Sequence, residues 1–300
     1  MFKTIIAGVD GRVGGRDAAA LGARLAAASG GRLILAHVYP FEPIHSRASN
    51  AEYDRVMRDE AQTLLETERE AAGVSGELTA VGDLSPARGL HRLAEDESAD
   101  LIVVGSCHRG TLGRVFAGDD ARSTMQGAPC AVAVAMQTSA ERTGPFASIG
   151  VGFDGSPESR RALDAAAALV RADGGEVRLL SVVVEPRPMS ATYAYVYDWE
   201  ASMKERRRYA QGKLDRALEA LDVPARGEVL TGTPALALEQ LSRDVDLLVV
   251  GARGFGPVRR VILGSTSDHV IRHAHCPVLI PPRGEGAETP EPEAVEKMMV

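Results

Sequence analysis

The strongest constraint on the fold is an internal repeat, in which one sequence pattern occurs twice along the chain. Thr4–Gly11 (TIIAGVDG) aligns with Ser148–Gly155 (SIGVGFDG), and Asp100–Gly105 (DLIVVG) aligns with Asp246–Gly251 (DLLVVG). Repeat units of solenoid proteins are only ~20–50 residues long. Each copy here takes up roughly half of 300 residues, which is a normal size for a domain. The repeat therefore predicts two similar domains.

Each copy alternates short Val/Ile/Leu-rich runs with Ala/Arg/Glu-rich segments whose apolar residues recur at helical spacing. In the second copy, this pattern predicts strands near 148–153, 176–184, 226–230, 246–250 and 277–280, and helices near 157–172, 201–221, 234–243 and 266–274. The first copy follows the same order. Strands that are apolar at nearly every residue favour a parallel sheet with helices on both faces. We therefore expect two tandem, doubly wound α/β domains.

The expected domain limits are residues 1–137 and 147–283. The segment between them contains Ser139, Thr143, Gly144 and Pro145, which is typical of a linker. Residues 284–300 combine glycines, prolines and several glutamates, so we expect a disordered acidic tail.

Composition argues against several classes of protein. No apolar run approaches the ~20 residues of a membrane span, and no export signal is recognised near the N-terminus. Three cysteines are too few for a disulfide framework, which favours a reducing compartment and predicts a cytoplasmic protein. A net charge of −7 disfavours binding to duplex nucleic acid.

The sharpest local signal is Gly251-Ala252-Arg253-Gly254, followed after nine residues by Gly264-Ser265-Thr266-Ser267. It follows a predicted strand and opens a predicted helix. Glycines allow backbone N–H groups to approach phosphate oxygens, and a helix N-terminus favours an anion. Ser265 is expected to be the N-cap, with Asp268 three residues later. The alternative is a flexible loop leading into a capped helix, since such a pattern resembles a capping box.

This motif resembles the nucleotide-binding motif of the ATP-binding universal stress proteins, here in a tandem form. Val9-Asp10-Gly11, Phe153-Asp154-Gly155, Leu35-Ala36-His37-Val38 and Gly232-Thr233-Pro234-Ala235 support the resemblance across both halves. It implies a five-stranded parallel sheet in the order 3-2-1-4-5 for each domain. Strands 1 and 4 then meet at the switch point where ligands of open α/β sheets bind.

The resemblance also implies a role for each matching residue in binding ATP, with or without Mg²⁺. Asp154 and the backbone near Phe153 would hold adenine and ribose, and Val182 would line the adenine slot. Ribose and phosphates would contact the motif itself, comprising Gly251, Arg253, Gly254, Gly264, Ser265, Thr266 and Ser267. Three alternatives stay open: Asp154 as a cap of the turn before Pro157, Val182 as a core residue, and Arg253 as a solvated side chain.

The first copy departs from the motif, because His108 replaces the second glycine and Asp119 replaces the serine after Gly118. A carboxylate ~4 Å from a phosphate charge costs about 4 kcal/mol near a protein surface, enough to lower affinity by ~10³. We expect the first site to be lost, unless Mg²⁺ held by Asp119 or Asp120 bridges the charges.

Other reactive residues give weak signals. Cys107 next to His108 is either a redox sensor or, as expected for most single cysteines, inert. The histidines show no clear metal pattern; although His269 and His273 are four residues apart, we expect no zinc site there. No catalytic residue is predicted, since the chain has neither a P-loop nor a nucleophile elbow, and its glycines follow the wrong strand for an NAD site.

The sequence therefore favours an ATP-binding regulatory protein whose role in stress is implied by the family. A slow Mg²⁺-dependent ATPase and a ligand-free interaction scaffold are the alternatives. We also expect the halves to pack through their fifth strands, Ala131–Ala135 and Pro277–Ile280, because each would otherwise be an exposed apolar edge. Pairing of two chains into a homodimer is a further expectation.

Overall fold

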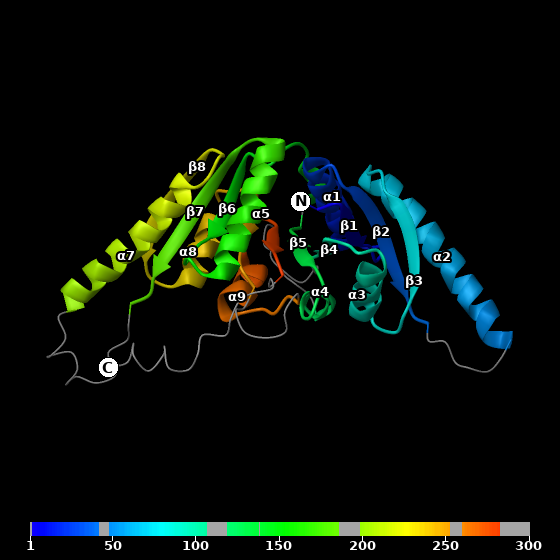
Figure 1. Cartoon of the computed structure of the whole chain (residues 1–300). Helices are drawn as coiled ribbons and strands as arrows, with labels where there is room; N and C mark the ends of the chain where they lie inside the picture. The colour runs from blue at the N-terminus through cyan, green and yellow to red at the C-terminus, as the bar shows by residue number, and fades with distance from the viewer. Residues whose placement is uncertain are drawn as a thin grey trace, which may run out of the picture.

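The computed structural model describes residues 2–41, 48–106, 119–137, 139–185, 199–252 and 260–282. Within them the strands form one ten-stranded sheet in the order β3-β2-β1-β4-β5-β10-β9-β6-β7-β8. Counted within each half, this is the order 3-2-1-4-5. Figure 1 shows the two halves side by side, with α2 and α7 on the outer flanks.

The elements of the N-terminal half are β1 (Thr4–Gly8), α1 (Val13–Ser29), β2 (Arg32–Tyr39), α2 (Ala48–Ala72), β3 (Glu77–Gly82), α3 (Pro86–Asp96), β4 (Leu101–Gly105), α4 (Asp119–Met125) and β5 (Ala131–Ala135). A 3-10 turn, η1 (Ser139–Glu141), leads to the C-terminal half. That half contains β6 (Ser148–Gly152), α5 (Pro157–Asp173), β7 (Glu176–Val183), α7 (Trp199–Glu219), β8 (Ala225–Thr231), α8 (Pro234–Leu241), β9 (Leu247–Val249), α9 (Ser265–His273) and β10 (Val278–Ile280).

The helices begin and end where local chemistry predicts. Proline occupies the first turn of α3, α5 and α8, where its missing N–H costs nothing. Helix α1 ends at Gly30, whose left-handed backbone (φ 63°) suits a residue without Cβ. Each strand and helix predicted for the second copy is found, and the expected α/β fold is confirmed.

Two apolar cores lie on opposite faces of the sheet, and both run through the two halves. One core packs the sheet against α1, α2, α5 and α7, and the other packs it against α3, α4, α8 and α9. Successive residues of β5 alternate between the two cores, with Ala133 on one face and Val134 on the other. This is why the central strands have no polar face. In the part of the chain that the structure describes, no helix is long and apolar enough to span a membrane.

The halves are joined where β5 pairs with β10, the antiparallel contact of an otherwise parallel sheet. The register pairs Val134 with Val278, Ala133 with Leu279 and Val132 with Ile280. Ala133 and Leu279 are equivalent positions of the repeat, so a pseudo-twofold axis passes through this pair. The arrangement is that of an isologous dimer within one chain, and packing through the fifth strands is confirmed.

A second connection between the halves lies beside the β5–β10 pairing, which we call the seam. The N–H of Gly127 donates to the carbonyl of Val261 (2.8 Å), and the N–H of Val261 donates to the carbonyl of Ala128 (3.0 Å). Arg260 bonds the carbonyl of Gly127 (3.0 Å) and the carboxylate of Glu95 (2.8 Å). The chain segment that leads into α9 is therefore fastened to the N-terminal half.

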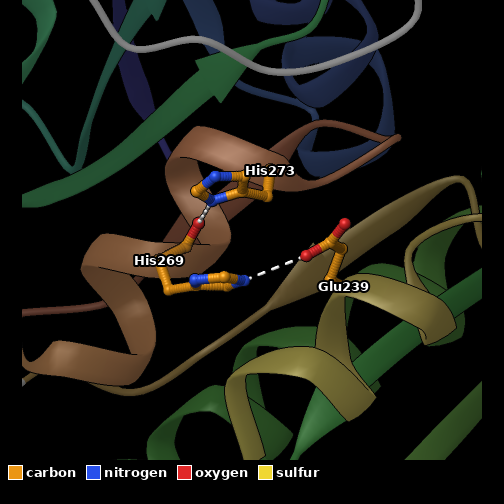
Figure 2. A group of neighbouring side chains, drawn as sticks. All are labelled: Glu239, His269 and His273. Atoms are coloured by element: carbon orange, nitrogen blue, oxygen red, sulfur yellow. Dashed lines mark hydrogen bonds and ion pairs between the residues drawn. The ribbon is translucent and has the colours of Figure 1, made fainter.

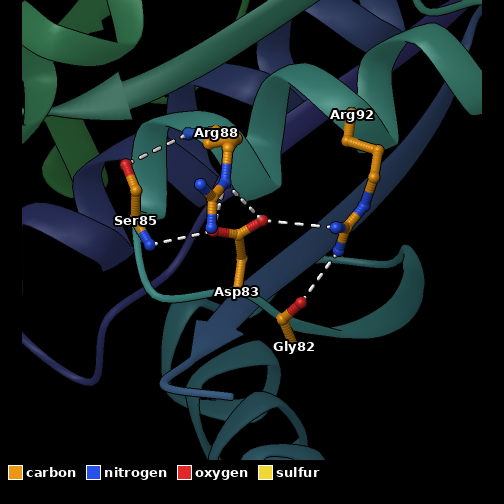
Figure 3. A network of polar contacts seen from close by, with 5 residues as sticks. All are labelled: Gly82, Asp83, Ser85, Arg88 and Arg92. Atoms are coloured by element: carbon orange, nitrogen blue, oxygen red, sulfur yellow. Dashed lines mark hydrogen bonds and ion pairs between the residues drawn. The ribbon is translucent and has the colours of Figure 1, made fainter. Parts of the chain in front are cut away.

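The turn between β3 and α3 is organised by a buried carboxylate, shown in Figure 3. The side chain of Asp83 is 2% exposed and accepts hydrogen bonds from the N–H of Ser85 (2.9 Å) and from Arg88 (2.8 Å). Arg92 reaches its other oxygen (3.2 Å) and also the carbonyl of Gly82 (2.8 Å). Burial alone would raise the pKa of Asp83, but these donors lower it below the ordinary value.

We predict that Leu279→Ala lowers the free energy of unfolding by about 2–5 kcal/mol, because it leaves a cavity at the pseudo-twofold axis. Leu279 is fully buried, whereas Leu236 is 58% exposed, so Leu236→Ala is the matched control and should change stability by less than about 0.5 kcal/mol. Urea unfolding measures both. Equal effects of the two substitutions would show that the seam does not carry the stability assigned to it.

We predict that Asp83→Asn lowers stability at neutral pH by about 1–3 kcal/mol, since it weakens a set of charge-assisted hydrogen bonds. Because folding lowers the pKa of Asp83, the unfolded chain binds the proton more tightly. The contribution of Asp83 is therefore complete above about pH 4 and declines as the pH falls further. Unfolding curves between about pH 6 and pH 3 should converge for the wild type and Asp83→Asn. Asp164→Asn, on an exposed position of α5, should show no such convergence.

Candidate functional site

A cavity of about 280 Å³ opens at the carboxyl ends of β6 and β9. These strands are parallel neighbours, and the order of the following strands runs outward in opposite directions from them, to β7 and β8 on one side and to β10 on the other. The cavity therefore lies at the topological switch point. Its walls come from the β6–α5 turn, the end of β7, the start of α8, the segment after β9 and the start of α9, with these lining residues: Gly152, Phe153, Asp154, Ser156, Glu158, Ser159, Leu180, Val182, Pro234, Leu238, Val250, Gly251, Ala252, Gly264, Ser265, Thr266 and Ser267.

The turn after β6 is held by local hydrogen bonds. The carboxylate of Asp154 accepts the N–H of Ser156 (2.8 Å), and the hydroxyl of Ser156 accepts the N–H of Ser159 (3.1 Å) at the start of α5. The backbone carbonyl of Asp154 accepts a hydrogen bond from the ammonium group of Lys213 in α7 (3.2 Å). Asp154 thus caps the turn before Pro157, which was one reading of the sequence, and it also lines the cavity.

The carboxylate of Asp154 is held in its charged form. Solvent reaches it, yet the surrounding walls would by themselves raise its pKa. Hydrogen bonds from Ser156 and Ser159 outweigh this effect and lower the pKa. The residue can therefore accept hydrogen bonds from a ligand over the whole neutral range.

Apolar side chains form one side of the cavity. Phe153 and Leu180 are buried, and the N–H of Phe153 donates to the carbonyl of Leu180 (2.9 Å), which fixes β6 against β7. Val182 is half-buried and contacts the core beneath while it lines the cavity. Val182 therefore packs on the core and also lines the cavity, and its contact with adenine stays a prediction. Leu238 of α8 and Val250 complete the apolar side of the cavity.

Gly251 lines the cavity and also packs closely against the first turn of α5. A Cβ at this position would lie 3.0 Å from the backbone carbonyl carbon of Glu158 in the first turn of α5. At the equivalent position of the first half, a Cβ on Gly105 would lie only 2.0 Å from the carbonyl oxygen of Gly14. In both halves, this glycine lets the first helix approach the end of the fourth strand.

The N-terminus of α9 differs from the sequence expectation, which made Ser265 the N-cap. Gly264 is the N-cap, and Ser265 is the first helical residue, with an exposed side chain. The hydroxyl of Ser267 accepts a hydrogen bond from the N–H of Gly264 (2.8 Å) and donates one to its carbonyl (3.1 Å). The third helical residue thus bonds back to the backbone of the N-cap. Glycine has no side-chain oxygen to accept hydrogen bonds from the first helical N–H groups, and these belong to residues that line the cavity.

Asp268 does not complete a capping box. Its carboxylate pairs with Arg272 one turn later (2.7 Å) and with Arg122 of α4 in the other half (3.2 Å). Asp268 therefore connects α9 to the N-terminal half.

The residues predicted for the site come together where the structure describes them. Phe153, Asp154, Val182, Gly251 and Gly264–Ser267 all line the one cavity, although they lie far apart in the sequence. Arg253 and Gly254 lie outside the described residues. Glu158, with a side chain that is 11% exposed, was missed, as were Pro234 and Leu238. Glu158 is the second residue of the helix that starts just after Asp154, and this position at a helix start beside the site is the signal that could have found it.

The corresponding region of the first half is described only in part. Cys107, His108 and Gly118 lie outside the described residues, and Asp119 is the first residue of α4. Cys130 and Cys276 occupy equivalent buried positions just before β5 and β10. Burial raises the pKa of Cys130 to about 12 and raises that of Cys276 as well, so both thiols stay protonated and unreactive.

Comparison with known proteins gives consistent matches across the chain. The model of the universal stress protein family matches residues 1–135 and again residues 145–282. A universal stress protein of Mycobacterium tuberculosis (strain H37Rv) is 30% identical over 92% of this chain and 96% of its own length. A universal stress protein of Thermus aquaticus is 36% identical over 45% of this chain and 98% of its own length, so it corresponds to a single half.

Among solved structures, a universal stress protein from Archaeoglobus fulgidus aligns with a TM-score of 0.68 at 20% identity. The alignment covers 94% of this chain and 98% of that one, which supports the same two-domain α/β fold. With the family model matching both halves and a relative matching nearly the full length, the chain belongs to the universal stress protein family.

Proposed function

We propose that the chain is an ATP-binding regulatory protein with its nucleotide site in the C-terminal half. The observation that carries this proposal is the convergence of the motif. Phe153–Asp154, Val182, Gly251 and Gly264–Ser267 come from separate segments and surround one cavity at the switch point of the sheet. Arg253 and Gly254 complete the proposed site on the basis of the sequence motif.

The cavity fits a nucleoside at its apolar end. Its volume of about 280 Å³ is slightly below the ~300–1,000 Å³ that is typical of small-ligand sites. We assign adenine to the surface formed by Phe153, Leu180 and Val182. Asp154, ionised and reached by solvent, would accept hydrogen bonds from ribose hydroxyls or the adenine amino group.

The phosphates are assigned to the other end, at the start of α9. The N–H groups of the first turn and the positive end of the helix dipole both favour an anion there. The exposed hydroxyl of Ser265 would donate a further hydrogen bond, and Thr266 lies beside it on the cavity wall. Because Ser267 is buried and bonded to Gly264, its role is to shape this turn.

The proposal includes Mg²⁺ because the cavity has acidic side chains beside the expected position of the triphosphate. Asp154 and Glu158 both line the cavity and add negative charge beside a ligand that is itself strongly anionic. A divalent cation bound with the triphosphate would offset this repulsion.

The remaining parts of the proposal rest on the sequence. The domains would extend over residues 1–137 and 147–283, and the protein would act in the cytoplasm, where nucleotide binding would control contact with a protein partner in a stress response. Pairing of two chains into a homodimer belongs to the same proposal.

We predict that Gly264→Ala weakens ATP binding by more than about tenfold, or ~1.4 kcal/mol, because the added Cβ crowds the phosphates. The backbone of Gly264 (φ −87°, ψ 173°) is open to alanine, so the fold should be unchanged. Gly118→Ala, at the equivalent position of the first half, is the matched control and should leave binding intact. Isothermal titration calorimetry measures both.

Two equal ATP sites per chain would contradict a site in the C-terminal half alone. ATP binding that survives Gly264→Ala and is lost in Gly118→Ala would show that the working site lies in the N-terminal half. An absence of any ATP binding by the wild type would instead favour the ligand-free scaffold.

We predict that Ser265→Ala and Ser267→Ala separate binding from stability. Ser265 is exposed, so its loss should weaken ATP binding by about threefold to tenfold and leave unfolding unchanged. Loss of the buried Ser267 hydroxyl should lower the free energy of unfolding by about 1 kcal/mol, because the N–H of Gly264 loses its partner. Calorimetry and urea unfolding of both variants test this. The reverse pattern would contradict the assignment of the phosphates to the Ser265 side of the turn.

A further inference from the structure

We propose that Glu239, His269 and His273 form a binding site for Zn²⁺ between α8 and α9. Potential ligand atoms of these three residues all lie within 4.8 Å of one another. In Figure 2 the two imidazole rings lie one above the other on one side of α9, and Glu239 of α8 faces the ring of His269. Two histidines with one glutamate are a known donor set for zinc, with a fourth position left for water.

The geometry of the first pair is close to that around a zinc ion. Nε2 of His269 lies 2.9 Å from Oε2 of Glu239. Two ligand atoms, each about 2.0–2.1 Å from a tetrahedral ion, are about 3.3 Å apart. A small rotation of the Glu239 side chain would therefore admit the ion, which would replace the proton that the two atoms share.

The second histidine is oriented as metal-binding histidines usually are. Nδ1 of His273 lies 2.9 Å from the carbonyl oxygen of His269. A carbonyl can only accept, so Nδ1 carries the proton, and in the neutral ring Nε2 keeps its lone pair for a metal. A hydrogen bond from the other ring nitrogen to a backbone carbonyl is the usual support of a histidine ligand.

A role in holding α8 against α9 would explain the contact between His269 and Glu239, but it would not explain the position of His273. The bond from His269 to Glu239 alone would tie the two helices together, whereas the hydrogen bond of His273 is to its own helix. His273 nevertheless stacks on His269, with ring centroids 4.2 Å apart and an interplanar angle of 20°. Two histidines four residues apart on one face of a helix are a known zinc-binding pattern. A rotation of the His273 ring out of the stack would point both imidazole lone pairs at one ion beside Glu239.

The site is accessible and lies beside the cavity. The side chains of His269 and Glu239 are 28% and 17% exposed, so an ion can enter from solvent. It would bridge α8 and α9, whose first residues, Pro234 and Ser265, line the cavity. The inference does not depend on nucleotide binding, since none of the three residues lines that cavity.

Equilibrium dialysis of the full-length, nucleotide-free protein against Zn²⁺ tests the proposal. The wild type should bind one more ion than Glu239→Gln or His273→Gln, because each substitution removes one ligand. Glu239→Gln keeps a hydrogen-bond acceptor for His269, and His273→Gln leaves the pair of Glu239 and His269 untouched, so both variants should fold. Binding at this site should weaken by more than about 100-fold in each, which exceeds the usual effect of losing an outer-shell partner.

His91→Gln is the control, since the ring of His91 bonds the carbonyl of Thr124 in the other half (2.6 Å) and is not one of the three proposed ligands. It should bind Zn²⁺ as the wild type does. Co²⁺ gives a second readout, because the intense visible absorption of a four- or five-coordinate complex should appear in the wild type and His91→Gln and be lost in the other two variants. Equal binding in all four proteins, or no binding by the wild type at micromolar Zn²⁺, would overturn the proposal.

Discussion

The antiparallel pairing of β5 with β10 is the contact on which the rest of the molecule depends. A five-stranded parallel sheet in either half would end in an exposed apolar strand, which is a site of aggregation. Here each edge strand covers the other, with Ala133 and Leu279 at the pseudo-twofold axis. Both cores then continue across the seam, so the two domains share their interiors. The second copy of the domain thus covers the edge strand of the first, and the first covers that of the second.

The same seam fixes one wall of the candidate site. Strand β9 lies between β10 at the seam and β6 at the cavity. The segment before α9 is fastened to the N-terminal half through Gly127 and Val261, and Asp268 of α9 pairs with Arg122 of α4. The start of α9 is therefore positioned by the opposite half of the chain. The N-terminal half therefore contributes to the position of the candidate site in the C-terminal half.

Much of the fold could be predicted from the sequence because apolar runs and helical spacing are local signals. The repeat then predicted two similar domains, and the family resemblance implied Asp154, Val182 and Gly251, which line one cavity. The start of α9 could not be assigned, because Gly264 and Ser265 are both acceptable N-caps and only the bond from Gly264 to Ser267 distinguishes them. Glu239 could not be connected with His269, since the two residues lie on different helices and meet only through tertiary packing.

Hydrogen–deuterium exchange with and without ATP and Mg²⁺ tests most directly whether the nucleotide site lies in the C-terminal half. Amides are protected where a ligand accepts their hydrogen bonds or restricts local opening. The account predicts slower exchange in peptides covering 152–159 and 264–268, and no comparable change in peptides covering 8–15 and 119–125. Equal protection in both halves, or protection confined to the N-terminal peptides, would contradict it.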